Sequence, residues 1–288
     1  LTELHAGGKF GGGAYGASGG LHGVGASVVN ALSAKLVAQV DRDGSTHELA
    51  FRERVAGQFS GSSFTAGHQL EKVKRISRNK TGTRIRFWPD SEIFDAEARI
   101  DADQVRERVV QACFLVPGVK IRVVDKRAGG SADPFEFVSR GGLADLVDYL
   151  STGGNACEVI TLSGIDTFEE RVPVDGRMSD IERECIVEVA LRWVKGYETR
   201  VESFVNTIPT SQGGTHTAGF DRALTRAVND VLLKDTRKLA KLARENNHRA
   251  TREDVQEGLV AACKVVFPEP QFRGQTKQEL GTPAIEKI

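Results

Sequence analysis

The sequence has 288 residues, 40% of them hydrophobic, and its 39 basic side chains balance 39 acidic ones. This length allows a large core in one big domain or two ordinary ones, and the balanced charge excludes a global field favouring nucleic acid or membranes. The cysteines are far apart with no C-x-x-C pair, which argues against a zinc site or a disulfide framework. No apolar run approaches the roughly 20 residues of a membrane span and no signal peptide is visible, so we expect a cytoplasmic protein without membrane contact.

The stretch from His5 to Ser33 is the most informative part of the sequence. Its first part is saturated with glycine and carries Lys9 and Tyr15, and it closes as an apolar run. Glycine lets successive backbone N–H groups converge, and a helix start adds unpaired donors and partial positive charge. The stretch therefore predicts a loop leading into the N-terminus of a buried helix, a place that receives phosphate.

A short glycine pattern, Gly20-Leu-His-Gly-Val-Gly25, lies inside this stretch. On its own such a pattern is often only a turn, and it is neither the Rossmann order nor a P-loop. Ser18 and Gly19 before it and His22 within it favour phosphate binding. The helix that follows is predicted from an apolar stripe at Val24, Val28 and Leu32.

The first half of the chain continues with alternating strands and helices. We predict strands at 35–40 and 46–51 joined by a turn, a long variable loop at 52–78, and a strand at 83–88 that Pro89 ends. A helix at 101–115 and a strand at 119–124 follow. This order predicts an α+β fold, an α/β sandwich with helices on one face of a mixed sheet.

The second half is richer in strands. A strand at 135–138 and a helix at 143–150 lead to the polar run 151–155, the best boundary candidate. Beyond it we predict the following elements: strands at 159–162, 167–172, 186–193 and 199–206, a helix capped by Thr215 that carries Phe220, Leu224, Val228 and Leu232, a solvated charged segment at 234–249, a helix at 254–262 and a strand at 263–267.

Five sequence blocks occur together along the chain: Leu4-His-Ala-Gly-Gly-Lys-Phe10 with Ser18 to Ser33, Thr81-Gly-Thr-Arg-Ile-Arg-Phe-Trp-Pro89, Asp125-Lys-Arg127, Gly213-Gly-Thr-His-Thr-Ala-Gly-Phe220, and Gln275-Thr-Lys277 with Leu280. In kind and order they resemble the B subunit of bacterial type IIA DNA topoisomerases, gyrase B and topoisomerase IV B. The resemblance implies an incomplete ATPase domain of the gyrase, Hsp90, histidine kinase and MutL type at residues 1–152. A transducer domain related to ribosomal protein S5 would follow at 153–288.

The resemblance also implies where ATP would bind. The backbone amides of a lid would wrap the β and γ phosphates; these residues are Gly20, Leu21, His22, Gly23, Val24, Gly25 and Ala26. Lys9 and Tyr15 would close over the nucleotide, and Thr83 would reach the adenine side. Outside these motifs, a packing role for His22 and a plain strand role for Thr83 would be favoured.

Gln275 and Lys277 would project from the transducer domain into the ATPase site, where the lysine touches the γ-phosphate. A cation beside a multiply charged oxyanion in a partly dry site gains interaction energy on the order of several kcal/mol. This energy differs between ATP and ADP, because only ATP has the γ-phosphate. Lys277 would thus stabilise the transition state and couple hydrolysis to domain rotation. Taken alone, Gln-Thr-Lys would be an exposed loop. Arg42 matches a position that contacts aminocoumarin inhibitors in relatives, with a solvated turn arginine as an equal alternative.

The family carries its general base, its Mg²⁺ ligand and its adenine-binding carboxylate before the lid. No residue of this chain matches them, and the chain starts at Leu1, without methionine, directly upstream of the lid. We therefore expect a partial chain whose cofactors are ATP and Mg²⁺, with the Mg²⁺ ligand outside it and no metal site within it. Made alone, it should bind ATP weakly and not hydrolyse it.

The implied function is that of an ATP-dependent type II topoisomerase B subunit. ATP would close a B-subunit homodimer into a gate that captures a DNA duplex, and hydrolysis would reset the gate. The A subunit would cut and rejoin DNA in a heterotetramer of two A and two B subunits. Ala26, Thr83-Arg-Ile-Arg86 and Gly281-Thr-Pro283 favour topoisomerase IV, and the alternative is a gyrase B subunit that supports negative supercoiling.

Two further alternatives are less favoured. A mismatch-repair clamp or chaperone of the same ATPase fold would not be expected to carry Gly213-Gly-Thr-His216 together with Gln275-Thr-Lys277. An unrelated α/β protein with an anion-binding loop would require Lys277 to lie more than about 15 Å from that loop. Whether basic residues at 234–241 guide DNA is left open, and a solvated face is the preferred interpretation.

Overall fold

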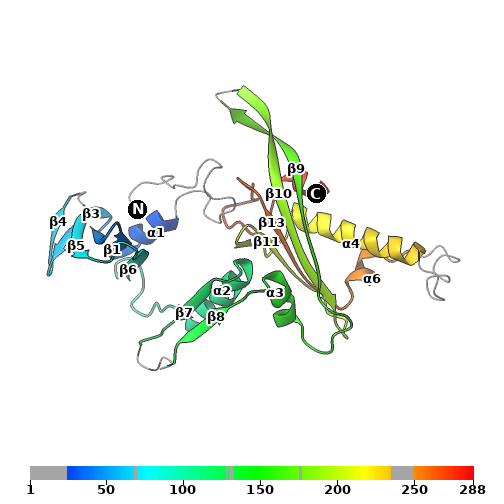
Figure 1. Ribbon diagram of the computed structural model, residues 1–288, viewed down its shortest axis with the longest axis horizontal. Coiled ribbons are helices and arrows are strands. Elements are labelled where there is room, and N and C mark those ends of the chain that lie inside the picture. The colour runs from blue at the N-terminus through cyan, green and yellow to red at the C-terminus, as the bar shows by residue number, and fades with distance from the viewer. Residues whose placement is uncertain (1–24, 68–69, 128, 130–132, 175–176, 235–248) are drawn as a thin grey trace. The chain divides into compact units, whose positions relative to one another are not determined.

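The computed structural model describes residues 25–67, 70–127, 129, 133–174, 177–234 and 249–288, which combine helices and β-sheets as predicted (Figure 1). They form two compact units that divide between Ile100 and Asp101. The domain boundary that the sequence predicts at 152/153 stays a prediction. None of the helices in these ranges is long and apolar enough to cross a membrane.

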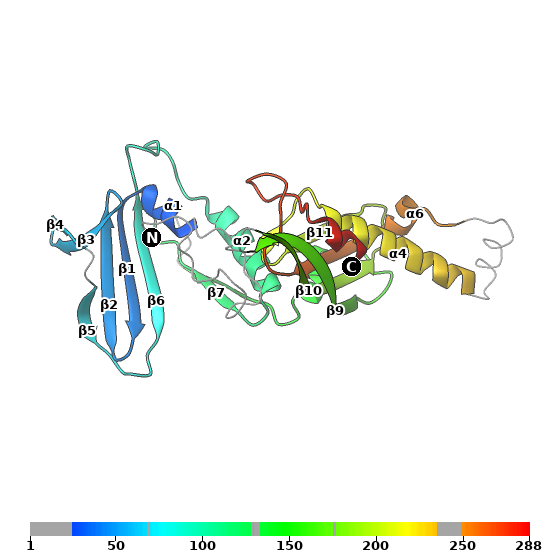
Figure 2. The same ribbon diagram turned by 90° about the horizontal axis from the view of Figure 1, so that it is seen from above.

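The first unit contains a six-stranded sheet in the order β4-β3-β2-β1-β6, with β5 also paired to β2 (Figure 2). Its elements are α1 (Gly25–Ala31), β1 (Ser33–Arg42), β2 (Ser45–Arg52), β3 (Val55–Ser60), β4 (Ser63–Ala66), β5 (Glu71–Arg75) and β6 (Gly82–Pro89). The β1–β2 hairpin and β6 confirm the predicted strands. Asp43 and Gly44 have φ angles of 52° and 76°, as the two-residue turn of this hairpin requires.

The predicted long loop at 52–78 is wrong, because β3, β4 and β5 lie within it. These strands are short, and all five residues of β5 are exposed, so no alternation of apolar and polar residues marks them. What holds β3 to β4 is local: the rings of Phe59 and Phe64 are 4.8 Å apart.

The prediction of a buried helix after the glycine-rich stretch is also wrong for the described part of that helix. Val28 is 45% exposed and Leu32, just after α1, is 37% exposed, whereas Ser27 and Asn30 are buried. Ser27 and Asn30 are three residues apart and so share one helix face. The predicted apolar stripe therefore lies away from the buried face.

The second unit is built on a five-stranded sheet in the order β12-β11-β13-β10-β9, antiparallel except for the parallel pair β11–β13. Its elements are α2 (Ala102–Leu115), β7 (Lys120–Val123), β8 (Phe135–Val138), α3 (Leu143–Leu150), β9 (Ile160–Val174), β10 (Arg177–Trp193), β11 (Arg200–Val205), β12 (Ile208–Pro209), α4 (Thr215–Lys234), α6 (Arg252–Gln256), β13 (Leu259–Val266) and the short 3₁₀ helix η1 (Pro283–Lys287).

Strand β13 is buried on both faces of this sheet. Val260 and Ala262 pack with α2 and α3 on one face. Leu259 and Ala261 pack with α4 on the other. Successive side chains of a strand point to opposite faces, so this alternation builds a three-layer arrangement of helices, sheet and helix. The prediction of helices on one face only is therefore too simple for this unit.

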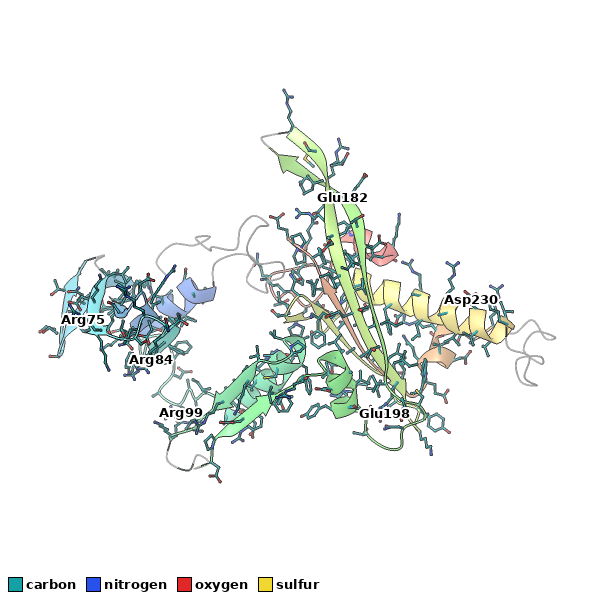
Figure 3. The ribbon with its side chains drawn as sticks, viewed as in Figure 1. Arg75, Arg84, Arg99, Glu182, Glu198 and Asp230 are labelled. Atoms are coloured by element: carbon teal, nitrogen blue, oxygen red, sulfur yellow. The ribbon has the colours of Figure 1, made fainter. Side chains whose placement is uncertain are left out.

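Several boundaries differ from the predicted ones. The strands predicted at 159–162 and 167–172 are one continuous strand, β9, and β10 begins at Arg177, so the two form a ribbon that extends beyond the sheet (Figure 3, at Glu182). The helix predicted at 254–262 ends at Gln256. Gly258, with φ +71°, stops it and lets β13 begin at Leu259.

Candidate functional site

A closed loop at residues 272–280 presents Lys277. Its base is a bridge between Phe272 and Leu280. Next to that bridge, the backbone N–H of Arg273 donates to the carbonyl of Glu279 at 2.9 Å, and the two side chains form an ion pair at 2.7 Å. The tip of the loop, beyond the Arg273–Glu279 pair, contains the Gln275-Thr-Lys277 segment singled out in the sequence.

This loop is joined by hydrogen bonds to the segment before α4. The N–H of Gln212 donates to the carbonyl of Gln278 at 3.0 Å, and the N–H of Leu280 donates to Gly213 at 3.0 Å. The N–H of Thr215 then donates to Leu280 at 3.1 Å. Two sequence blocks more than sixty residues apart therefore form one structural element.

The glycine pair at 213–214 is explained by this close approach. A Cβ added to Gly214 would lie 2.3 Å from the carbonyl oxygen of Leu280, and the φ angle of Gly214 is +133°. Only glycine fits such a position. The predicted cap of α4 is wrong in its residue: the hydroxyl of Thr217 accepts from the N–H of Gly214 at 3.0 Å, while the Thr215 hydroxyl is buried without a partner among the described residues.

The Lys277 side chain is half-buried, with its Nζ 6.0 Å from the ring centroid of Phe272. Burial lowers the pKa of Lys277 below its ordinary value of 10.5. Among the described residues no carboxylate forms an ion pair with it. Its backbone has φ +57°, a conformation uncommon outside glycine and one that tight turns impose. The ammonium is therefore available to an anion, and Gln275 beside it is exposed.

His216, in the block Gly213-Gly-Thr-His216, is one of several buried polar residues that sequence reasoning did not assign to the site. It is 3% exposed, and its Nε2 lies 3.1 Å from the hydroxyl of Thr210. That hydroxyl lies 2.7 Å from the hydroxyl of Ser203. Burial lowers the pKa of His216 to about 4, so its ring is neutral at pH 7. Its place two residues after a glycine pair and inside an amphipathic helix was the available signal.

Thr83 lies on β6 opposite Val40 of β1 and lines a hollow of about 440 Å³. In the same hollow, Asp41 accepts from the Thr46 hydroxyl at 2.6 Å and pairs with Lys80 at 3.1 Å. The Thr46 hydrogen bond, followed by Lys80, lowers the pKa of Asp41. A charged, hydrogen-bonded rim of this kind can recognise a polar ring.

Most of the predicted lid lies outside the described residues: Lys9, Tyr15, Gly20, Leu21, His22, Gly23 and Val24. Gly25 and Ala26 are described and form the exposed start of α1. Arg42 is exposed at the end of β1 and pairs with its neighbour Asp43 at 3.5 Å. The residues lining the hollow beside Thr83 do not include it.

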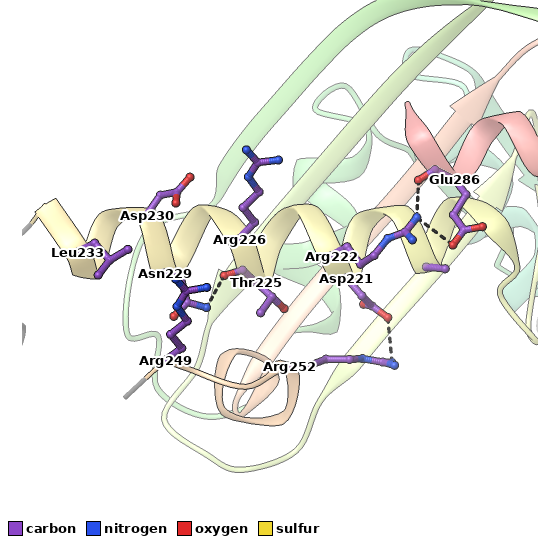
Figure 4. A pocket seen from close by; sticks show the side chains of 11 residues that line it. Asp221, Arg222, Thr225, Arg226, Asn229, Asp230, Leu233, Arg249, Arg252 and Glu286 are labelled. Atoms are coloured by element: carbon purple, nitrogen blue, oxygen red, sulfur yellow. Dashed lines mark hydrogen bonds and ion pairs between the residues drawn. The ribbon is translucent and has the colours of Figure 1, made fainter. Parts of the chain in front are cut away.

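A second hollow, of about 630 Å³, lies along α4 and contains several arginines (Figure 4). Arg252 pairs with Asp221 at 2.9 Å, and Arg222 pairs with Glu286 at 2.9 Å. Arg226 and Arg249 are exposed and make no ion pair with another described residue. They point to opposite sides of α4 in Figure 4, and each guanidinium group can donate hydrogen bonds to an anion such as phosphate.

No group of three or more His, Cys, Asp or Glu side chains in the described ranges is placed to hold a metal ion.

Comparison with known proteins decides the family. A family model described as DNA gyrase B matches residues 142–288, which include the Gly213-Gly214 pair and the Lys277 loop. The chain belongs to the DNA gyrase B family. Gyrase B of Streptococcus pneumoniae is 40% identical over 289 residues, and that of Enterococcus faecalis is 38% identical over 289 residues.

These gyrase B relatives are longer than this chain. Each match covers 100% of the chain but only 40% of the relative. The ATPase domain of Thermus thermophilus gyrase B, solved with an aminocoumarin, matches with a TM-score of 0.65 and 32% identity, covering 92% of this chain and 62% of that one. The ATP-binding domain of Francisella tularensis topoisomerase IV also has a TM-score of 0.65, at 24% identity over 96% of this chain and 65% of that one. That second likeness supports the fold only.

Proposed function

We propose that this chain is part of the B subunit of an ATP-dependent type II DNA topoisomerase and that Lys277 reads the γ-phosphate of ATP. The observation that carries the proposal is the loop at 272–280, whose closed hydrogen-bonded base holds a lysine that forms no ion pair with any carboxylate in the described part of the chain. Membership of the gyrase B family supports it.

The chain's own residues would bind and orient the nucleotide. The Lys277 ammonium would stabilise negative charge on the γ-phosphate, worth on the order of several kcal/mol in a partly dry site. Gln275 would contact the same phosphate. Thr83 would face the adenine side, and the lid from Gly20 to Ala26, with Lys9 and Tyr15, would close over the phosphates. Mg²⁺, bound through residues outside this chain, would neutralise phosphate charge.

The conformational role follows from the same contact. Lys277 would gain its partner with ATP and lose it with ADP, so hydrolysis would release the transducer domain at 153–288 from the ATPase part at 1–152. In the complete protein this would close and reopen a gate between two B subunits around a DNA duplex, while the A subunit cuts and rejoins DNA. Arg226 and Arg249, which form no ion pair with another described residue, are suited to contact DNA phosphates.

Kinetics of the complete subunit test the proposal. Lys277→Ala should lower kcat for ATP at least about 100-fold, the typical loss when one charge-stabilising donor is removed, with little change in ADP affinity. Lys287→Ala, an exposed lysine in η1, is the matched control and should leave kcat unchanged. Unchanged hydrolysis in Lys277→Ala would rule out this role of the lysine.

The type of topoisomerase is a separate proposal. The blocks in the sequence favour topoisomerase IV, whereas the Streptococcus pneumoniae and Enterococcus faecalis relatives are named gyrase B. The complete subunit with its A subunit should relax and decatenate DNA without introducing negative supercoils. Negative supercoiling in the same assay would assign gyrase instead.

A further inference from the structure

His216 has no part in the contacts proposed above, yet it is one of the most buried polar residues of its unit. We propose that His216 is a positioning residue for Lys277, acting through Thr210 and the hydrogen bonds that join residues 210–215 to 278–280. The inference rests on the proposed role of Lys277. It adds a residue that touches neither nucleotide nor DNA.

The first step runs from His216 to Thr210. The ring Nε2 lies 3.1 Å from the Thr210 hydroxyl, and that hydroxyl lies 2.7 Å from the Ser203 hydroxyl on β11. The Ser203 hydroxyl also lies within hydrogen-bonding distance, 2.9 Å, of the Thr210 carbonyl. Thr210 is thus held by the side chain of His216 from α4 and by that of Ser203 from the sheet.

The second step runs from Thr210 to the Lys277 loop. The Thr210 carbonyl accepts from the N–H of Gly213 at 2.8 Å, which fixes the start of the glycine pair. Gln212 and Gly213 then hydrogen-bond to Gln278 and Leu280, each at 3.0 Å. Gln278 directly follows Lys277 in the chain, so a shift of residues 210–213 moves the lysine with it.

His216 does more than fill space in the core. Its Nδ1 is buried without a partner among the described residues, and leaving a buried polar atom unpaired is unfavourable, so an apolar side chain would suit this place better if only packing mattered. Lys277 forms no ion pair with another described residue that could set its position. Its position is therefore set by the backbone of its loop. The hydrogen bond between His216 Nε2 and Thr210 therefore helps to position Lys277 through the loop backbone.

Hydrogen exchange of the 288-residue chain tests the positioning directly. His216→Leu should accelerate exchange of the Gln212, Thr215 and Leu280 amides, whereas His216→Gln, which can still reach Thr210, should retain most of their protection. Thr210→Val and Thr210→Ser form a second pair with the same expected contrast, should His216→Leu fold poorly.

The control for general destabilisation is Val147→Ala, in the core between α3 and the sheet. It should accelerate exchange across the unit. If His216→Leu and Thr210→Val produce the same even acceleration, the positioning role is overturned.

Kinetics of the complete subunit test whether positioning acts through Lys277. His216→Leu should lower kcat about tenfold, equivalent to about 1.4 kcal/mol, with ADP affinity unchanged. Combined with Lys277→Ala, it should lower kcat no further than Lys277→Ala alone, because both changes remove one contact. Multiplicative losses in the double variant would contradict the inference. If Lys277→Ala alone leaves kcat unchanged, the proposed function fails, while the exchange result still decides whether His216 positions the loop.

Discussion

Gly214 lies directly against Leu280, so that a Cβ on the glycine would stand 2.3 Å from the leucine carbonyl oxygen and 2.5 Å from its nitrogen. Leu280 is fully buried and closes the loop that carries Lys277. The glycine pair before α4 and the lysine loop near the end of the chain are therefore two halves of one contact. This explains why both blocks are found together in one sequence.

Gly214→Ala should break this contact. The added methyl group clashes with backbone atoms that cannot rotate away, and φ +133° strains any residue with a Cβ, so we expect the free energy of unfolding to fall by about 2 kcal/mol or more. Chemical denaturation measures the change. Gly196→Ala, where nothing lies within 4 Å of the added Cβ, should change stability by less than about 1 kcal/mol. Equal effects of the two variants would contradict the account of this contact.

His216 should make stability depend on pH. Its pKa is about 4 in the folded chain, against an ordinary value of 6.5, because burial disfavours the charged ring. Between these values the unfolded chain binds more protons, so stability is complete above pH 6.5 and falls as the pH drops to 4, by about 3 kcal/mol. Measured across this window, the free energy of unfolding of the wild-type chain should fall relative to that of His216→Gln as the pH drops from 6.5 to 4. Parallel curves would show that His216 does not titrate in this way.

The start of α2 depends on Asp101. Its carboxylate accepts from the backbone N–H groups of Asp103 at 2.8 Å and Gln104 at 3.2 Å. Asp101→Ala should lower the free energy of unfolding by about 1 kcal/mol, the usual value of a helix N-cap. Asp95→Ala, at an exposed position before the helix, is the control and should have little effect in the same denaturation experiment. A neutral Asp101→Ala would mean that the helix start is held by other groups.

Thr83 should contribute to nucleotide affinity in the complete subunit. Thr83→Val keeps the shape of the side chain but removes one hydrogen-bonding group from the hollow that Thr83 lines together with residues of β1, β2 and β5. Loss of one neutral hydrogen bond corresponds to about 2- to 10-fold weaker ATP binding. Calorimetric titration would measure it, with Thr65→Val on the exposed strand β4 as the control. The assignment of Thr83 to the adenine side fails if both variants bind ATP equally well.

The sequence alone predicted the parts of the fold whose signals are local. The β1–β2 turn, the helix behind Asp101 and the strand ending at Pro89 each depend on residues within a few positions of one another. It failed where the sequence pattern is weak: β3 and β4 are short strands of local hairpins, β5 is fully exposed and is placed by its pairing with β2, and α1 buries Ser27 and Asn30 rather than its valines.

The candidate site shows the same limit. Gln275-Thr-Lys277 and Gly213-Gly-Thr-His216 were found as separate blocks of sequence. Their union through Leu280, and the hydrogen bonds from His216 to Thr210 and from Thr210 to Ser203, are tertiary contacts that no spacing in the sequence encodes.

The most direct test of the central claim is a crystal structure of the complete subunit bound to a non-hydrolysable ATP analogue. We predict that the Lys277 Nζ lies about 2.7–2.9 Å from an oxygen of the γ-phosphate, the distance of a charge-assisted hydrogen bond. A Lys277 side chain directed into solvent, with the γ-phosphate held by other residues, would contradict the account.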